Sequence, residues 1–373
     1  MPRKISLYIF GEMAVPFAIS LAVLTVTALL SKVIKLVELL LVHGVGASFI
    51  FRFVLSVTPA FLIYTIPISF LIAVLVAFTR MSSDSEITAM KASGLSLFTM
   101  MRPVVALALV SYAATLLLML YVFPWGNLNA KSLLFDAARE RLTAGIEEKT
   151  FYEGFKGIIL YVDRVSHETG EMEGIFISEK TGPAESNVFF AEKGVFGSSK
   201  DEFSIYLRLI DGTLHRKDPG SYHIADFSKY TLEIALPKGG VPDVMSRTNR
   251  ELYPGELAGK VRALAARGVN TAPFVIDLHK RFALPASVFV FSLLGVPLGL
   301  QKMRSARSTG FSIALGVVLV YYVLSTALEA AGENGVINPV LSVWGSDIIM
   351  GAAGAYIFYM TAKDRKILGR NFR

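Results

Sequence analysis

The residues GNLNAKSLLFDAARERLTAGIEEKT (126–150) open, and NTAPFVIDLHKR (270–281) close, the polar stretch Gly126–Arg281 that decides the fold. This stretch lies between two sets of three hydrophobic segments. The contrast predicts a polar domain inserted between two groups of membrane helices, before any motif is considered.

Composition supports the same class of protein. The chain has 373 residues, of which 53% are hydrophobic and only 18% charged, and its mean hydropathy is +0.53. These values are too apolar for an ordinary soluble enzyme and indicate an integral membrane protein. The net charge of +7 comes from basic residues scattered between hydrophobic runs, which is a pattern of membrane topology. We therefore expect no nucleic-acid partner.

Six segments reach the roughly 17 to 25 residues needed to cross a hydrocarbon core about 30 Å thick. They are expected near 13–36, 55–79, 103–124, 283–300, 309–331 and 341–361. Glycines in the last three segments should permit close helix contacts. These are Gly295, Gly299, Gly316, Gly351 and Gly354.

Orientation follows from the lysines and arginines of the short connections. If the N-terminus is inside, the inner loops and the C-terminus hold most of these residues, whereas the short outer loops hold Arg52 alone. Both termini are therefore expected in the cytoplasm of a bacterium. The polar stretch should then lie in the periplasm.

Within the polar stretch the pattern changes from helix to strand. Runs rich in β-branched and aromatic residues are separated by Gly, Pro, Asp or Ser, which predicts at least six short strands in a sandwich or jelly roll. The runs are 157–163, 172–178, 188–196, 203–215, 221–227 and 230–236. Apolar triplets such as Ile158-Ile159-Leu160 favour burial on both faces of the sheet, and a lipid-accessible interior is the alternative.

The pattern becomes helical again after Pro242, with an amphipathic run from Tyr253 to Arg267. The expected fold class is thus a polytopic α-helical membrane protein with six transmembrane helices and an inserted periplasmic β-jelly-roll domain. The expected divisions are helices one to three over 1–125, the jelly roll over 126–250, a helical connector over 251–282, and helices four to six with a cytoplasmic tail over 283–373.

No catalytic constellation is evident. The five histidines show no metal-ligand spacing such as H-E-x-x-H, and the chain has neither cysteine nor a phosphate-binding G-x-x-x-x-G-K-[ST] loop. We expect no catalytic residue, no metal site and no cofactor in this chain. If ATP drives the protein, a separate chain hydrolyses it.

The connection between the second and third hydrophobic segments carries the most informative short motif. Ser83 and Glu86 have the spacing of a capping box, Ile87 and Met90 share one helical face, and Gly94 is a suitable C-terminal stop. The motif predicts a short helix near 83–94 that lies on the membrane surface. An ordinary interfacial connector has the same features.

The string Ser85-Glu-Ile-Thr-Ala-Met-Lys-Ala-Ser-Gly-Leu-Ser96 closely resembles the coupling-helix signature of the LptF/LptG family, the permeases of the bacterial lipopolysaccharide exporter. The resemblance covers essentially the whole chain, including 277–285 and Gly-Val-Pro-Leu-Gly at 295–299. The strings 85–88 and 226–230 are more similar to LptF than to LptG.

This resemblance implies a permease subunit of an ABC exporter that extracts lipopolysaccharide from the inner membrane and passes it to a periplasmic bridge. The implied partners are a second LptF/LptG-type permease, a dimeric LptB-type ATPase, LptC-type and LptA-type bridge proteins, and lipopolysaccharide. It also implies that Glu86 contacts the ATPase, with Ile87 and Met90 on the same coupling helix. The alternative is that Glu86 only caps its own helix.

Lys32 and Lys35 are three residues apart near the outer end of the first segment, so they share a helix face. From the residues alone they could snorkel to water or pair with Glu38. The resemblance implies that basic residues here hold the phosphates of lipid A. A further basic group at the edges of the polar stretch could form a collar at a cavity mouth or make local ion pairs. Its members are Arg139, Arg141, Lys131, Lys280 and Arg281.

Two other functions remain open. One is a mechanotransmission-type permease for another lipid or a lipoprotein, and the other is a non-transporting membrane scaffold or sensor. A secondary transporter is less favoured, because Glu329 and Asp347 are the main candidates for intramembrane charges and both lie near segment ends.

Overall fold

The computed structural model describes residues 2–41, 47–144, 148–155, 157–166, 171–180, 186–199, 204–218, 221–234, 248–301 and 306–363. The chain forms two compact units. A helical unit comprises Met1–Asn127 and Asn249–Arg373, and a β unit comprises Leu128–Thr248. Each unit is described by itself.

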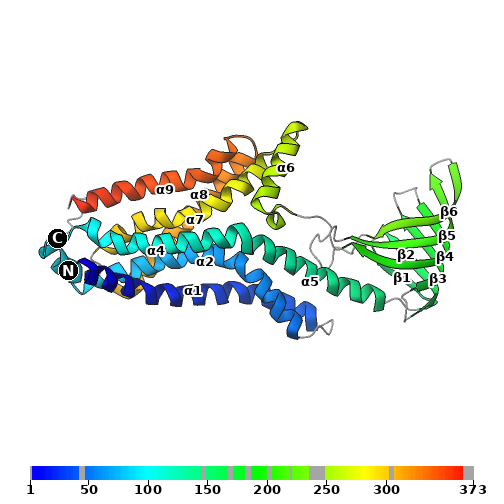
Figure 1. The fold of residues 1–373 in the computed structure, drawn as a ribbon, viewed down its shortest axis with the longest axis horizontal. Coiled ribbons are helices and arrows are strands. Elements are labelled where there is room, and N and C mark those ends of the chain that lie inside the picture. Colours follow the sequence, from blue (N-terminus) through cyan, green and yellow to red (C-terminus); the bar gives the residue numbers. More distant parts are fainter. Residues whose placement is uncertain are drawn as a thin grey trace. The chain divides into compact units, whose positions relative to one another are not determined.

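The helices lie mainly in the helical unit, but α5 begins there and continues into the β unit (Figure 1). In chain order they are α1 (Pro2–Leu41), α2 (Ala47–Ser83), α3 (Glu86–Ala92), α4 (Leu97–Leu117), the π-helical turn η1 (Leu118–Val122), α5 (Phe123–Ala144), the 3₁₀ turn η2 (Asn249–Glu251), α6 (Pro254–Ala266), α7 (Ala272–Gly299), α8 (Ala306–Glu333) and α9 (Pro339–Ala362). In the described part of the chain, six helical stretches are long and apolar enough to cross a membrane, which confirms the six predicted segments. They are Arg3–Ser31, Ser48–Ser83, Leu97–Asp136, Ala272–Gly299, Gly310–Glu333 and Pro339–Ala362.

The third predicted segment is much longer than 103–124. It continues through α4, η1 and α5 as far as Ala144, well into the polar stretch. Pro124 does not end it, although proline lacks an N–H and its ring collides with the carbonyl four residues earlier. That carbonyl belongs to Leu120, inside the π turn, where the backbone is already widened by one residue. The helix therefore passes the proline and carries its polar continuation out of the hydrophobic span.

The core of the helical unit is built around α2. Phe70, Leu71, Val74, Leu75 and Phe78 are fully buried and belong to one hydrophobic cluster with residues of α1, α3, α4, α7, α8 and α9. Between membrane helices there is little hydrophobic driving force, so close approach through small residues provides the attraction.

Glycines of α7 allow α2 to come close. A Cβ atom added at Gly299 would lie 2.8 Å from Cβ of Phe78, and one at Gly295 would lie 3.0 Å from Cγ1 of Val74. Gly354 of α9 similarly approaches α7, which confirms three of the predicted close contacts. The prediction is wrong for Gly316, because an added Cβ there meets no atom within 4 Å.

The β unit is a single antiparallel sheet of β1 (Phe151–Phe155), β2 (Ile158–Val165), β3 (Glu171–Lys180), β4 (Ser186–Ser199), β5 (Ser204–Asp218) and β6 (Ser221–Ile234). An inserted β domain between the third and fourth membrane helices is thus confirmed. The strands pair in chain order from β1 to β6, so the described part of the sheet is a meander in which every connection joins neighbours. The runs 221–227 and 230–236, expected as two strands, lie largely in the single strand β6.

One face of this sheet forms the core of the β unit. Leu160, Ile177, Phe189 and Leu209 are almost fully buried there, and Phe135 of α5 belongs to the same cluster. The polar continuation of α5 therefore ends as a core element of the β unit. This placement explains why the polar stretch begins with a helix although its later residues form strands.

The opposite face is not buried, so the expectation of burial on both faces is wrong for the described strands. Ile159 lies between two buried neighbours and is 36% exposed, Phe190 is 46% exposed and Phe151 is 62% exposed. The ordinary alternation of a half-buried strand holds after all. The apolar triplets place their middle residues on this second face.

Gly126 provides a test of helix packing. A Cβ atom at this position of α5 would overlap the backbone carbonyl oxygen of Ser56 on α2, so the two helices must separate in Gly126→Ala. We expect the free energy of unfolding to fall by about 1–3 kcal/mol, measured by thermal unfolding of the purified chain in detergent. Gly316→Ala is the matched control, because its new methyl group meets open space. Equal stabilities of the two variants would contradict the packing.

Candidate functional site

The predicted surface helix is present as α3, but it begins differently from the expectation. Ser83 is the last residue of α2, so the predicted capping box of Ser83 with Glu86 is wrong. The chain turns through Ser85, whose φ is 59°, in the left-handed region. Ser85 makes no side-chain cap hydrogen bond. The sequence pattern fitted a cap, but the continued winding of α2 removed Ser83 from that position.

The end of α3 agrees with the prediction. Gly94 has a φ of 86°, the left-handed conformation that glycine adopts without strain. The amide of Leu95 donates to the carbonyl of Met90 at 3.1 Å, and that of Gly94 donates to the carbonyl of Lys91 at 3.0 Å. These two bonds form a Schellman motif, which ends the helix and turns the chain towards α4.

The three predicted coupling residues have different environments. Ile87 is 5% exposed and Met90 is half-buried, and both pack against the hydrophobic cluster of the helical unit. The Glu86 side chain is 30% exposed at the surface. In this arrangement Ile87 anchors α3 to its own chain, whereas Glu86 remains accessible to a partner.

The carboxylate of Glu86 is held by side chains of other helices. The hydroxyl of Tyr8 on α1 donates to Oε2 of Glu86 at 2.7 Å, and Nη2 of Arg80 on α2 lies 3.6 Å from Oε1. Nη2 of Arg80 also donates to the Tyr8 hydroxyl at 2.9 Å and lies 3.0 Å from Oε2 of Glu12. Nε of Arg80 lies 4.0 Å from Oδ2 of Asp84. We call Tyr8, Glu12, Arg80, Asp84 and Glu86 the Arg80 cluster.

Sequence reasoning missed Tyr8 and Glu12 as members of this site. The available signal was Glu12 itself, a lone acidic residue just before the first apolar run. Tyr8 and Arg80, which contact Glu86, lie on α1 and α2, so its carboxylate is shared between helices and is not confined to its own helix start.

The predicted phosphate-binding residues lie on helices, but their side chains are outside the described part of the structure. Lys32 and Lys35 fall within α1 and share one helical segment, as expected. Arg139 and Arg141 fall within α5. Their roles stay predictions.

Two other basic residues at the edges of the polar stretch, Lys280 and Arg281, make contacts within the helical unit. Nζ of Lys280 on α7 lies 2.6 Å from Oε2 of Glu329 on α8. Arg281 is 2% exposed, and its Nη2 donates to the backbone carbonyl of Asn249 at 2.9 Å, while Nδ2 of Asn249 donates to Asp277 at 2.8 Å. These contacts fasten the returning chain to α7. The described contacts of Lys280 and Arg281 are therefore local contacts between elements of the helical unit, and they do not form a collar.

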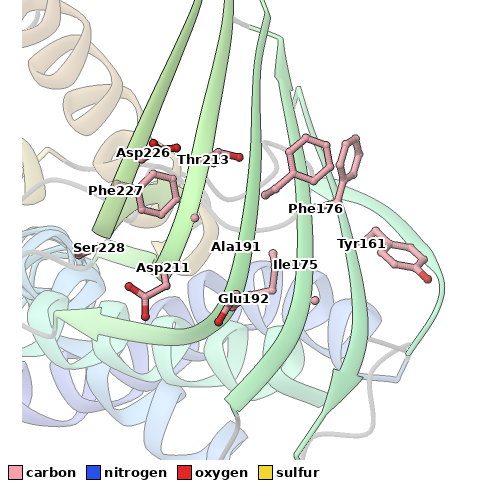
Figure 2. A pocket seen from close by; sticks show the side chains of 13 residues that line it. Tyr161, Ile175, Phe176, Ala191, Glu192, Asp211, Thr213, Asp226, Phe227 and Ser228 are labelled. Carbon is pink, nitrogen blue, oxygen red and sulfur yellow. The ribbon is translucent and has the colours of Figure 1, made fainter.

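A cavity of about 870 Å³ lies on the β unit. Figure 2 shows the rings of Tyr161 and Phe176 on one side of it and Phe227 on the other. The lining also includes the carboxylates Glu192, Asp211 and Asp226. Aromatic rings can hold apolar groups, but carboxylates repel phosphates. The cavity is thus better suited to apolar groups than to lipid phosphates.

Aromatic side chains continue from this cavity along the exposed face. Phe151, Tyr161, Phe176 and Phe190 are successive cross-strand neighbours on β1 to β4. Their ring centroids are 5.0 Å apart for Phe151 and Tyr161 and 5.3 Å apart for Phe176 and Phe190. Contacts of this kind stabilise the sheet. Among the described residues, no group of three or more His, Cys, Asp or Glu side chains could hold a metal ion.

Comparison with known proteins assigns these features to one family. Residues 7–360 match the family described as "Lipopolysaccharide export system permease LptF/LptG". The "Lipopolysaccharide export system permease protein LptF" of Escherichia coli K12 is 22% identical over 296 residues, which cover 76% of this chain and 75% of that protein. The LptF protein of Shigella flexneri shows the same similarity. An uncharacterized protein of Rickettsia prowazekii is 23% identical over 318 residues, covering 82% of this chain and 83% of that protein.

The family is one of permeases, not of catalytic enzymes. Its match extends across both sets of membrane helices, α3 and the inserted sheet. With its six candidate membrane spans and inserted β domain, the chain belongs to the LptF/LptG family of lipopolysaccharide export permeases.

Proposed function

We propose that this chain is the LptF-type subunit of an ATP-driven exporter that takes lipopolysaccharide from the bacterial inner membrane and passes it to a periplasmic bridge. The observation that carries the proposal is the family match over residues 7–360, together with α3 presenting Glu86 at the surface. The similarity to LptF of Escherichia coli supports the LptF-type assignment. Both termini would be cytoplasmic and the β unit periplasmic, as the basic residues of the short loops indicate.

Glu86 would receive the force of a dimeric LptB-type ATPase. A surface carboxylate at a helix start is favoured by the helix dipole and attracts an arginine or lysine of a partner. The Schellman motif at Gly94 and the buried side chain of Ile87 hold α3 rigidly enough to transmit a displacement. Met90 is half-buried against the same hydrophobic cluster and would help to hold α3 in place.

A second LptF/LptG-type permease would complete the cavity for lipid. Of the candidate spans in the described residues, α1 and α8 bury the least of their surface within this chain. Val15, Ile19 and Val23 form an exposed stripe at intervals of four residues on α1, and Leu315 and Leu319 do so on α8. These stripes could hold acyl chains or the partner permease, while Lys32 and Lys35 bind lipid phosphates and Arg139 and Arg141 extend the basic surface.

The β unit would continue the route towards LptC-type and LptA-type bridge proteins. Its aromatic cavity can accept apolar groups, whereas its core face is filled by its own side chains and by Phe135. Lipid contact within the β unit would therefore require either the exposed aromatic face or an opening of the core. ATP would be bound by the separate ATPase, and this chain would need no cofactor.

Copurification tests the proposed assembly. A tagged chain should recover an ATPase and a second permease from native bacterial membranes. Glu86→Ala should weaken ATPase binding about tenfold or more, because a cation of the partner loses its carboxylate. Glu333→Ala, at the exposed end of α8, is the control and should leave binding unchanged. Recovery without an ATPase or a second permease would favour a scaffold or sensor.

Lipid crosslinking tests the phosphate-binding role. In the assembled complex, Lys32→Glu with Lys35→Glu should strongly reduce both lipopolysaccharide transport and photocrosslinking from a probe placed beside them, since two repelling charges replace two attracting ones. Arg3→Glu with Lys4→Glu, which changes the charge of the same helix by the same amount, is the matched control. Undiminished crosslinking and transport would reject the role of these lysines. Recovery of phospholipid alone from the cavity would instead favour a permease for another lipid.

A further inference from the structure

The Arg80 cluster joins three helices that are distant in the sequence. Tyr8 and Glu12 belong to α1, Arg80 lies in the last turn of α2 with Asp84 just beyond that helix, and Glu86 begins α3. The hydrogen bond from Tyr8 to Glu86 spans 78 positions in the sequence, and that from Arg80 to Tyr8 spans 72. A local turn cannot produce these contacts, so they define how α1 and α3 are placed on the end of α2.

The bonding within the cluster is directional. One nitrogen of the Arg80 guanidinium contacts Glu12, Tyr8 and Glu86, and the Tyr8 hydroxyl accepts from Arg80 while it donates to Glu86. Tyr8 is therefore a relay between the cation and the carboxylate. Single exposed ion pairs contribute only about 0–1 kcal/mol, but networks with shared, charge-assisted hydrogen bonds hold their geometry better.

Helix α1 is buried beside the Arg80 cluster and exposed on one side beyond it. Ile9 and Met13 flank the cluster residues of α1 and are fully buried in the hydrophobic cluster around α2. Beyond them, Val15, Ile19 and Val23 are exposed. Helix α1 is thus fastened to the core beside Tyr8 and Glu12 and continues to pack through Phe17 and Leu24, while Val15, Ile19 and Val23 lie on its exposed side.

We infer that the Arg80 cluster makes α3 and the first turns of α1 one mechanical unit, in which Tyr8 and Glu12 are positioning residues that transmit a displacement of α3 to α1. This inference rests on the proposed function, because the displacing force comes from the partner ATPase. A pull on Glu86 is shared at once with Arg80 and Tyr8, and Arg80 shares it with Glu12. The exposed stripe of α1 then moves with the coupling helix.

Isosteric substitutions separate transmission from docking. Tyr8→Phe and Glu12→Gln, alone and together, keep the shape of α1 and leave Arg80 and Glu86 in place. In the assembled complex, we expect ATPase binding and ATP hydrolysis to stay at the level of the unsubstituted protein. Lipopolysaccharide released per ATP hydrolysed should fall about fivefold or more in the double variant, the range of a typical coupling free energy. If Glu12→Asp, which keeps the charge, replaces Glu12→Gln in the double variant, the release per ATP should fall less.

Spin labels provide a readout that a loss of stability would not mimic. Because the sequence contains no cysteine, Lys4→Cys on α1 and Ala92→Cys at the end of α3 give two unique labelling sites at exposed positions. With the cluster intact, the distance between the labels should be the same in nucleotide-free and ATP-bound complexes. In the Tyr8→Phe, Glu12→Gln double variant the distribution of distances between the labels should broaden, and its mean should change with nucleotide. Tyr356→Phe and Glu333→Gln, at exposed positions of α9 and α8, are the matched controls.

The outcomes distinguish this inference from the proposed function. Normal release per ATP and unchanged label distances in the double variant would overturn the inference while the transport function stands. Loss of ATPase binding in that variant would also overturn it, because the cluster would then only shape the docking surface. If the unsubstituted complex moved no lipopolysaccharide, the proposed function would fail, and the label distances would still decide whether the cluster ties α3 to α1.

Discussion

The rest of the helical unit depends on the close approach of other helices to α2. Membrane helices gain little from exchanging lipid for protein contacts, so their association relies on surfaces that fit closely. Gly299 against Phe78 and Gly126 against Ser56 provide such fits at two positions along α2. With α2 enclosed in this way, its last turn becomes a stable base for the chain that follows. Arg80 lies on that turn, and α3 inherits its position from it.

This arrangement contrasts a well-packed centre with thinly covered helices. Helices α2 and α7 are the most buried of the candidate spans in the described residues, whereas α1 and α8 are the least. A permease that must open and close needs both properties, because packed helices carry force and loosely packed ones can move. The ion pair of Lys280 with Glu329 adds a contact between α7 and α8. The sparsely buried α8 is therefore tied to α7 near its end.

Sequence patterns with a single physical cause were predictive. Long apolar runs gave the six spans, the change to β-branched residues gave the inserted sheet, and Gly94 gave the end of α3. Patterns with competing causes were not. Ser83 could either continue α2 or cap α3. Because α2 winds as far as Ser83, this residue cannot cap α3. The third segment was expected to end near residue 124, where the apolar run stops, yet the helix continues through the π turn into α5.

Contacts between distant residues were the least predictable. Nothing local connects Tyr8 with Glu86, and Arg281 gave the same basic signal as a surface residue although it is buried against the carbonyl of Asn249. The strand order of the sheet was also beyond reach, since six similar runs fit a meander as well as a sandwich. The roles of four basic residues remain predictions from sequence, because their side chains lie outside the described residues: Lys32, Lys35, Arg139 and Arg141.

The π turn at Leu118–Val122 also sets which way the side chains of α5 point. One residue advances an α-helix by about 100°, and a π turn absorbs one extra residue without ending the helix. Upstream, α4 packs into the hydrophobic cluster around α2; downstream, Gly126 approaches α2 and Phe135 joins the core of the sheet. A chain one residue shorter in this turn would keep its helix and its composition but aim both residues elsewhere. When related permeases are aligned, the helical periodicity of the residues should therefore be counted separately before and after this turn.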